Sequence, residues 1–159
     1  MTAASKIAVI DYGLGNLQSV VRGLEAAGCC PVVTADPELI ASADGIVLPG
    51  VGAFAEEMEK LAPVRRVVEA AVREKPLLGI CLGMQMLLER SEEHGMHEGL
   101  GMIPGSVRRF PRMPGLKVPQ MGWNTITPSD HPLFADVADG TFMYFVHSYY
   151  ADTTAECTI

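Results

Sequence analysis

The sequence predicts an α/β protein built on a mostly parallel sheet flanked by helices, and three observations support that fold class. Short apolar, β-branched runs recur along the first half of the chain. Between them lie stretches whose apolar residues recur at helical spacing. Two of the runs end in glycine-containing loops, which in such sheets belong near the same carboxyl edge. At 159 residues the chain suits one domain, so we expect a single domain over residues 1–159.

The first strand and helix are predicted close to the N-terminus. Ile7–Ile10 is a continuous apolar run, as expected for a strand that is buried on both faces of a parallel sheet. After a short loop, apolar residues recur at helical spacing from Leu17 to Leu24. Asn16 is placed to cap the start of this helix, and Gly28 to end it. Together these segments form one strand–helix unit.

The same alternation continues to the middle of the chain. Each further strand is a short apolar run, and each further helix is a stretch with helical periodicity. We expect strands at Pro31–Thr34, Gly45–Leu48 and Leu77–Ile80, and helices at Pro37–Ala43, Ala53–Leu61 and Val64–Arg73.

The pattern changes after a further predicted helix over Met84–Arg90. Glycine and proline divide residues 95–115 into short segments without helical periodicity, which favours an antiparallel extension. A strong strand signal covers Thr141–Tyr150. The sequence stops at Ile159 with no closing helix, so we expect a C-terminal part of the domain to be missing.

Composition excludes several classes of function. A formal net charge of -7 argues against a protein that binds nucleic acid electrostatically. The first residues lack the long apolar segment of a signal peptide, and no later run approaches the length of a membrane span. We therefore expect a cytoplasmic protein with neither a nucleic-acid nor a membrane partner.

The segment from Gly79 to Gly83 is the most informative part of the sequence, because it places Cys81 between two glycines. A strand that turns sharply into a helix holds the residue at the turn in a strained backbone conformation, and side chains two residues away on either side would collide. Glycines at both positions remove that collision. The N–H groups at the start of the following helix stabilise a thiolate. Cys81 is therefore a candidate nucleophile at what is termed a nucleophile elbow.

Free cysteine is also one of the most buried residue types, so a core role for Cys81 is the alternative. Cys29 and Cys30 are adjacent, and Cys81 and Cys157 stand far apart, so there is neither a disulfide framework nor a C-x-x-C motif. We expect Cys29, Cys30 and Cys157 to be small core or near-core residues.

Five segments together resemble the class I, or triad, glutamine amidotransferases, and within them the branch that serves imidazole glycerol phosphate synthesis. The resemblance covers essentially the whole chain and implies a flavodoxin-like fold. Its segments are residues 11–16 (DYGLGN), 49–52 (PGVG), 79–85 (GICLGMQ), 120–124 (QMGWN) and 144–150 (YFVHSYY).

The resemblance implies that Cys81 attacks the side-chain amide of L-glutamine, giving a glutamyl thioester and ammonia. The oxyanion would be stabilised by the backbone N–H of Leu82 and by a second donor from the loop at Val51 and Gly52. Flanking glycines would let the peptide group in that loop rotate, so that its N–H is held away from the oxyanion until a partner subunit has bound its own substrate. The implied substrate-binding residues are Gly50, Gln85, Glu93, His147, Ser148 and Tyr149. Glu93 otherwise ends a charged stretch, 89–93, that is most simply a solvated helix end.

The resemblance also implies a heterodimer with a cyclase subunit of (β/α)8-barrel fold, which receives the ammonia. Trp123 would face this partner, although a lone tryptophan is usually a packing residue. Asn16 is a helix cap by local reasoning and a partner contact by the family's pattern.

One departure from the family concerns the catalytic base. The family completes its triad with a later His-x-Glu, and the sequence ends before any such motif. His147 is the last histidine in the sequence. Both a hydrogen-bonded structural role and a role in substrate binding remain open for it. We expect the 159-residue form to be inactive without the missing residues.

We expect neither a metal nor a cofactor. His94 and His97 have a spacing that hints at metal, but no cysteine or carboxylate ligand set accompanies them. Gly13 and Gly15 lack the third glycine of a dinucleotide-binding loop.

Two other functions remain open on the sequence. One is a non-catalytic or regulatory binding module on the same fold. The other is a cysteine hydrolase that uses the same turn on a different acyl substrate. A later His-x-Glu motif would favour the glutaminase, and the absence of such a motif would favour the binding module. Activity on an acyl substrate other than glutamine would favour the hydrolase.

Overall fold

A computed structural model describes residues 4–159 and contains a four-stranded parallel sheet in the order β2-β1-β3-β4. All neighbouring strands in this sheet run parallel. The predicted α/β fold class is therefore confirmed. The strands are β1 (Lys6–Ile10), β2 (Cys30–Thr34), β3 (Gly45–Gly50) and β4 (Leu77–Cys81).

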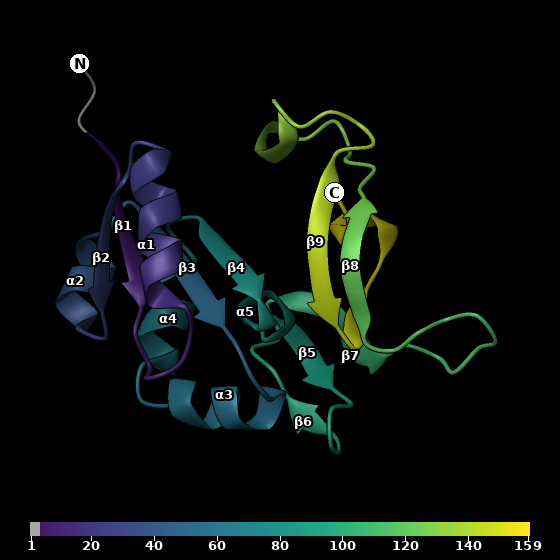
Figure 1. The fold of residues 1–159 in the computed structure, drawn as a ribbon. Helices are drawn as coiled ribbons and strands as arrows, with labels where there is room; N and C mark the ends of the chain where they lie inside the picture. The colour runs from purple at the N-terminus through teal and green to yellow at the C-terminus, as the bar shows by residue number, and fades with distance from the viewer. Residues whose placement is uncertain (1–3) are drawn as a thin grey trace.

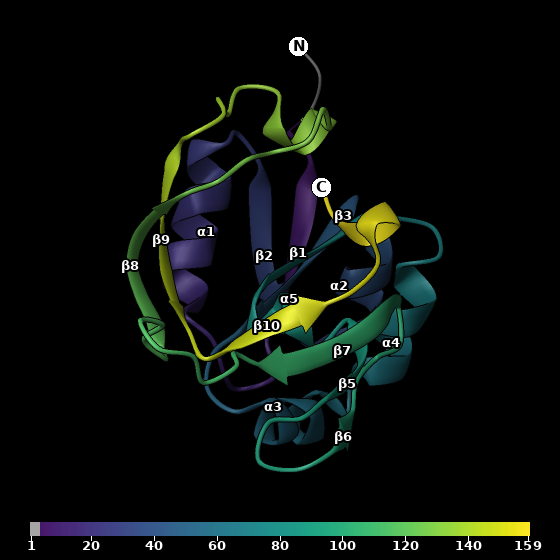
Figure 2. The same cartoon turned by 90° about the vertical axis from the view of Figure 1, so that its right-hand side faces the viewer.

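Helices lie on both faces of this sheet, as Figures 1 and 2 show: α1 on one side, α2 and α4 on the other. All six residues of β3 are buried, which agrees with its central position and its continuous apolar sequence. The core gathers apolar side chains from the sheet and from α2, α3 and α4. The helices are α1 (Leu17–Ala26), α2 (Pro37–Ser42), α3 (Phe54–Leu61) and α4 (Arg65–Ala71).

The helix predicted over Met84–Arg90 is wrong. Helix α5 spans only Leu82–Gln85, and the chain then forms strand β5 at Leu88–Ser91. The apolar residues here have helical spacing, but the backbone of β5 pairs with β7 (Ile103–Arg109) on one side and β6 (His97–Glu98) on the other. Tertiary pairing thus overrides local periodicity. Glu89–Glu93 is consequently not a solvated helix end.

The second half of the chain forms a mixed sheet in the order β10-β7-β5-β6. The expected antiparallel extension is correct in part: β7 pairs antiparallel with β10 (Tyr149–Asp152), whereas β5 and β7 are parallel. Strands β8 (Gln120–Thr125) and β9 (Phe142–His147) form a separate antiparallel ribbon. In Figure 1 this ribbon stands beyond β4, away from the parallel sheet. Two short 3-10 helices lie at Pro132–Phe134 and Ala155–Cys157.

The long strand predicted over Thr141–Tyr150 is broken at Ser148. Its first part pairs with β8, and its second part, β10, pairs with β7. Figure 2 shows the sharp change of direction between β9 and β10. This break brings His147, Ser148 and Tyr149 over the end of the parallel sheet. Among residues 4–159, no helix is long and apolar enough to cross a membrane.

Candidate active site

Cys81 lies at the end of β4 with φ 56° and ψ −118°. Residues other than glycine rarely adopt such a positive φ. Its side chain is exposed, so the core role is excluded. Strand β4 ends at Cys81 and α5 begins at Leu82, which is the predicted strand–turn–helix geometry. The backbone thus holds the thiol at the tip of a strained turn, where a nucleophile is accessible.

The neighbouring glycines are required by close backbone contacts. A Cβ atom on Gly79 would lie 2.6 Å from the Cα of Met84, and one on Gly83 would lie 2.0 Å from the carbonyl oxygen of Leu48. Both separations are well inside van der Waals contact. The steric reason inferred from the sequence is therefore confirmed at both positions.

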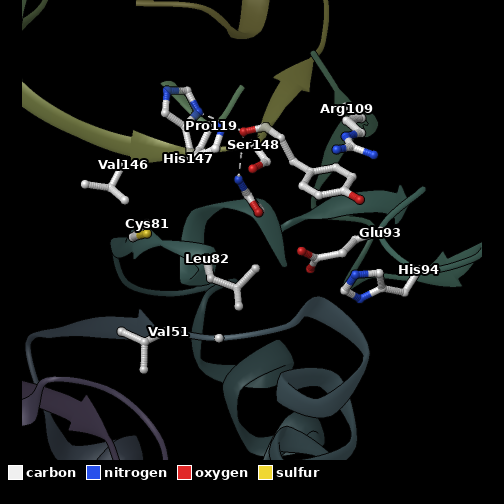
Figure 3. Close-up of a pocket in the computed structure, with 13 residues that line it drawn as sticks. Val51, Cys81, Leu82, Glu93, His94, Arg109, Pro119, Val146, His147 and Ser148 are labelled. Carbon is white, nitrogen blue, oxygen red and sulfur yellow. Dashed lines mark hydrogen bonds between the residues drawn. The ribbon is translucent and has the colours of Figure 1, made fainter. Parts of the chain in front are cut away.

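The two glycine-containing loops meet because of the register between β3 and β4. Gly50 is paired directly with Cys81 across these strands. A Cβ atom on Gly50 would lie 2.3 Å from the backbone nitrogen of Gly83, so the loop and the turn are packed backbone to backbone. Residues Val51 and Gly52 consequently follow Gly50 into the space in front of Cys81, as Figure 3 shows for Val51.

An open pocket of about 510 Å³ lies over this edge. That volume is in the range of small-molecule sites. Nine of the sequence-predicted site residues line it: Val51, Gly52, Cys81, Leu82, Gln85, Glu93, His147, Ser148 and Tyr149. Gly50 is buried behind the loop, and Asn16 and Trp123 lie elsewhere.

The carbonyl oxygen of Tyr149 ties two of these side chains together (Figure 3). It accepts a hydrogen bond from Nε2 of Gln85 at 3.3 Å and one from Nδ1 of His147 at 2.8 Å. Because a carbonyl only accepts, His147 carries its proton on Nδ1. The imidazole also packs against the rings of Phe110 and Phe145 and points away from Cys81 in Figure 3.

Glu93 lies across the pocket, after the end of β5. Its Oε2 accepts a hydrogen bond at 2.7 Å from the backbone N–H of Phe54, which is the first residue of α3. Ala53, the residue before that helix, provides no side-chain cap. Glu93 therefore caps α3, and this bond fixes one edge of its carboxylate at the pocket.

The backbone N–H of Val51 is already engaged. It donates a hydrogen bond to Oε1 of Glu57 at 2.9 Å. The other carboxyl oxygen of Glu57 contacts the hydroxyl of Tyr12, which also contacts the carbonyl oxygen of Pro49. This Tyr12–Glu57 pair was not found from the sequence, where Glu57 has the appearance of an ordinary charged helix residue.

Burial changes the acidity of both groups. Glu57 is completely buried, and desolvation raises the pKa of its carboxyl, although hydrogen bonds from Tyr12 and Val51 act in the opposite direction. Desolvation likewise raises the pKa of the Tyr12 hydroxyl, and the neighbouring Glu57 raises it further. Both groups are consequently favoured in their neutral forms.

Two residues expected at a partner interface are on the surface away from the pocket. Asn16 caps α1, with its side-chain oxygen accepting from the N–H of Ser19 at 3.4 Å. Trp123 is 66% exposed in β8, and its ring packs edge-on against Tyr144 of β9. Trp123 is therefore not a core residue.

The pocket also contains residues that the sequence analysis did not select: His94, Arg109, Pro119 and Val146. Arg109 is paired with Tyr149 in the β7–β10 register, which carries it to the pocket. Its neighbour Arg108 instead meets Asp152 at 3.0 Å and Glu92 at 3.5 Å. Strand alternation separates the two arginines, but nothing in the sequence says which of them faces the site.

The cysteines differ from one expectation. Cys30 and Cys157 are exposed and Cys29 is intermediate, so Cys30 and Cys157 are not core residues. Across the described part of the chain, residues 4–159, no group of three or more His, Cys, Asp or Glu side chains is arranged to hold a metal ion.

Comparison with known proteins decides the family. Residues 8–159 match the sequence profile described as glutamine amidotransferase class-I. The chain belongs to the class-I glutamine amidotransferase family. A crystal structure of a putative GMP synthase subunit from Thermoplasma acidophilum has the same fold, with a TM-score of 0.65 and 21% identity over 95% of this chain and 68% of that one.

Among class-I glutamine amidotransferases, several curated relatives carry the name imidazole glycerol phosphate synthase subunit HisH. The protein from Methanosarcina mazei is 56% identical over 97% of this chain and 77% of its own length. The protein from Synechococcus elongatus is 51% identical over 94% of this chain and 71% of its own length. The resemblance stated from the sequence motifs is therefore confirmed.

Proposed function

We propose that the chain is the glutaminase subunit of an imidazole glycerol phosphate synthase in histidine biosynthesis, hydrolysing L-glutamine to glutamate and ammonia. The observation that carries the proposal is the position of Cys81, whose exposed thiol lines a pocket and whose backbone is held in a strained conformation. The relatives at 51–56% identity support the same activity.

In this proposal, Sγ of Cys81 attacks the amide carbon of glutamine. The carbonyl oxygen becomes an oxyanion, which requires donors placed before the reaction begins. Leu82 is the first residue of α5, so its N–H has no acceptor within the helix. The N–H of Val51 is the second donor, once it is free. The amide nitrogen takes up a proton, its bond to the carbonyl carbon breaks and ammonia leaves. Water then hydrolyses the glutamyl thioester to glutamate and the free thiol.

The rest of the pocket binds the amino-acid part of glutamine. The free edge of the Glu93 carboxylate suits the substrate's ammonium group, and Gln85 together with the backbone at His147, Ser148 and Tyr149 forms the opposite wall. Gly50 allows the two backbone segments behind Cys81 to pack closely, because no side chain fits between them.

We propose that residues 1–159 form part of one domain whose general base lies in residues that follow Ile159. The relatives are longer than the stretch that matches, since 71–77% of their length is covered. His147 supports this view, because its Nδ1 is bound to Tyr149 and its ring points away from Cys81 (Figure 3). The 159-residue form should then release ammonia several orders of magnitude more slowly than a chain of the relatives' length.

The ammonia passes to a cyclase subunit with a (β/α)8-barrel fold, in a heterodimer. Trp123 and Asn16 are the proposed contacts with this partner. A large, exposed tryptophan paired with a tyrosine is typical of an interface anchor.

The test is glutamate release by the chain with its natural C-terminus, saturated with the cyclase and its substrate. Cys81→Ala should reduce the rate by about 10^4-fold or more, because the nucleophile is lost. Cys30→Ala is the matched control and should leave the rate unchanged, since Cys30 lies in β2, outside the pocket. A Cys81→Ala protein that keeps wild-type activity would refute the proposal, and activity on an acyl compound but not on glutamine would favour a different cysteine hydrolase.

A further inference from the structure

The loop that forms one wall of the pocket is held by a buried side chain that the proposed chemistry does not use. Val51 donates its backbone N–H to Oε1 of Glu57. A backbone N–H points in one direction, so this N–H cannot at the same time stabilise an oxyanion formed at Cys81. As the structure stands, one of the two proposed oxyanion donors is occupied.

Glu57 is unusual in this molecule. Among residues 4–159 it is the one acidic or basic residue that is buried, and its exposed fraction is 0%. A buried carboxyl group is costly unless it is hydrogen-bonded. Its partners are Val51 in the loop and Tyr12, which follows β1. The hydrogen bonds of this buried carboxyl group therefore connect helix α3 to the loop at Val51 and to Tyr12.

The two contacts of the Tyr12 hydroxyl indicate how the protons are distributed. The hydroxyl lies at hydrogen-bonding distance from both Pro49 O and Glu57 Oε2, yet it has one proton to donate. The hydroxyl therefore donates either to Glu57 Oε2 or to Pro49 O at any one time. In both cases Oε1 of Glu57 accepts the hydrogen bond from the N–H of Val51.

The consequence is that two successive peptide groups are held by one pair of side chains. Tyr12 binds the carbonyl of Pro49, and Glu57 binds the N–H of Val51. Between them lies Gly50, and after them comes Gly52, which has φ +110° and open space within 4 Å of where a Cβ would lie. Glycines on both sides give the Gly50–Val51 peptide room to rotate once Glu57 releases it.

We propose that Glu57 and Tyr12 are positioning residues that hold the loop 49–52 in a resting arrangement, with the Val51 N–H withheld from the oxyanion hole. This inference rests on the proposed function. Activation by a partner then requires that the Val51–Glu57 hydrogen bond break. Glu57 in this way limits ammonia release when no partner is present to use it.

The decisive variant is Glu57→Met, which fills a similar volume without an acceptor. Hydrogen exchange at the Val51 amide should become at least tenfold faster, because its acceptor is gone. Without the partner, the chain with its natural C-terminus should hydrolyse glutamine roughly tenfold faster, the factor expected for one hydrogen bond. The stimulation by the loaded partner should shrink correspondingly. Glu57→Gln retains an acceptor and should restore slow exchange at Val51.

Glu56→Gln is the matched control, since Glu56 is exposed on the same helix and pairs with Lys60. It should leave both readouts unchanged. Tyr12→Phe is the second variant, should Glu57→Met fail to fold, and is expected to act in the same direction to a smaller extent. Unchanged exchange at Val51, or an unchanged or lower partner-free rate, in folded Glu57→Met would overturn the inference, and the same results in Tyr12→Phe would do so if Glu57→Met does not fold. Exchange needs no activity, so wild-type protein that releases no glutamate with its partner would refute the proposed function separately.

Discussion

At the scale of single residues, the turn at Cys81 depends on backbone contacts that leave no room for a methyl group. Gly83→Ala should destabilise the chain by about 3 kcal/mol or more, because the new Cβ would be 2.0 Å from Leu48 O and neither backbone can yield freely. Urea unfolding measures this change as a lower midpoint.

Gly23→Ala is the corresponding control. Gly23 lies within α1, and a Cβ there would meet nothing within 4 Å. Alanine is the better helix former, so this variant should gain about 0.5–1 kcal/mol. If Gly83→Ala proved as stable as Gly23→Ala, the close packing described at the turn would be incorrect.

Glu57 also predicts a pH dependence of stability. Its carboxyl is buried and its pKa is raised in the folded chain, so the folded state holds the proton more tightly than the unfolded state. The resulting stabilisation is complete below the unfolded pKa, near 4.5, and is lost as the pH rises through the folded pKa. Glutamine at this position cannot ionise.

The stability of Glu57→Gln relative to wild type should therefore increase as the pH rises above about 4.5, as measured by urea unfolding. The titratable groups that act on Glu57 are Tyr12, through a hydrogen bond from the loop after β1, and the charged Glu56 and Lys60 on its own helix. Glu56→Gln should not reproduce the trend. A difference between Glu57→Gln and wild type that stays constant with pH would show that Glu57 does not change its protonation on folding.

The nucleophile and its glycines could be predicted from the sequence because their steric reason is local. Cys81, Gly79 and Gly83 lie within five residues, and the strand–turn–helix pattern fixes their relation. The Val51–Glu57 bond could not be predicted in this way. It depends on how α3 packs under the loop and on Tyr12, 45 residues earlier in the chain.

At the scale of elements, the strand–helix alternation of the first half was predictable because each strand is a separate apolar run. The error at Met84–Arg90 has a different origin. Residues 84–90 have a helical period, but β7, which follows more than ten residues later, supplies a partner for Leu88–Ser91. Such pairing is invisible to a pattern read along a single segment.

The β8–β9 ribbon presents Trp123 and Tyr144 to the surface, and there we expect the cyclase to bind. Trp123→Ala should weaken association by roughly 2 kcal/mol or more, measured by titration calorimetry with a chain of the relatives' length. Leu39→Ala, in α2 on the far side of the parallel sheet, should not change the affinity. Equal affinities for the two folded variants would remove Trp123 from the interface.

At the scale of the whole molecule, the parallel sheet positions the thiol, and the second half of the chain closes the pocket over it. The elbow and the loop at 49–52 come from adjacent strands, whereas Glu93, His147 and Tyr149 come from the mixed sheet and the ribbon. A reagent that resembles glutamine should consequently be recognised by both halves before it reacts with Cys81.

The most direct measurement is therefore covalent labelling with a chloroketone analogue of glutamine, followed by peptide mapping. Cys30 and Cys157 are exposed, as Cys81 is, so accessibility alone would not distinguish the three thiols. We predict modification at Cys81 alone under limited labelling, prevented by excess L-glutamine, while iodoacetamide also modifies Cys30 and Cys157. Equal modification of all four cysteines by the glutamine analogue, or labelling of Cys81 that glutamine does not prevent, would contradict a glutaminase site at Cys81.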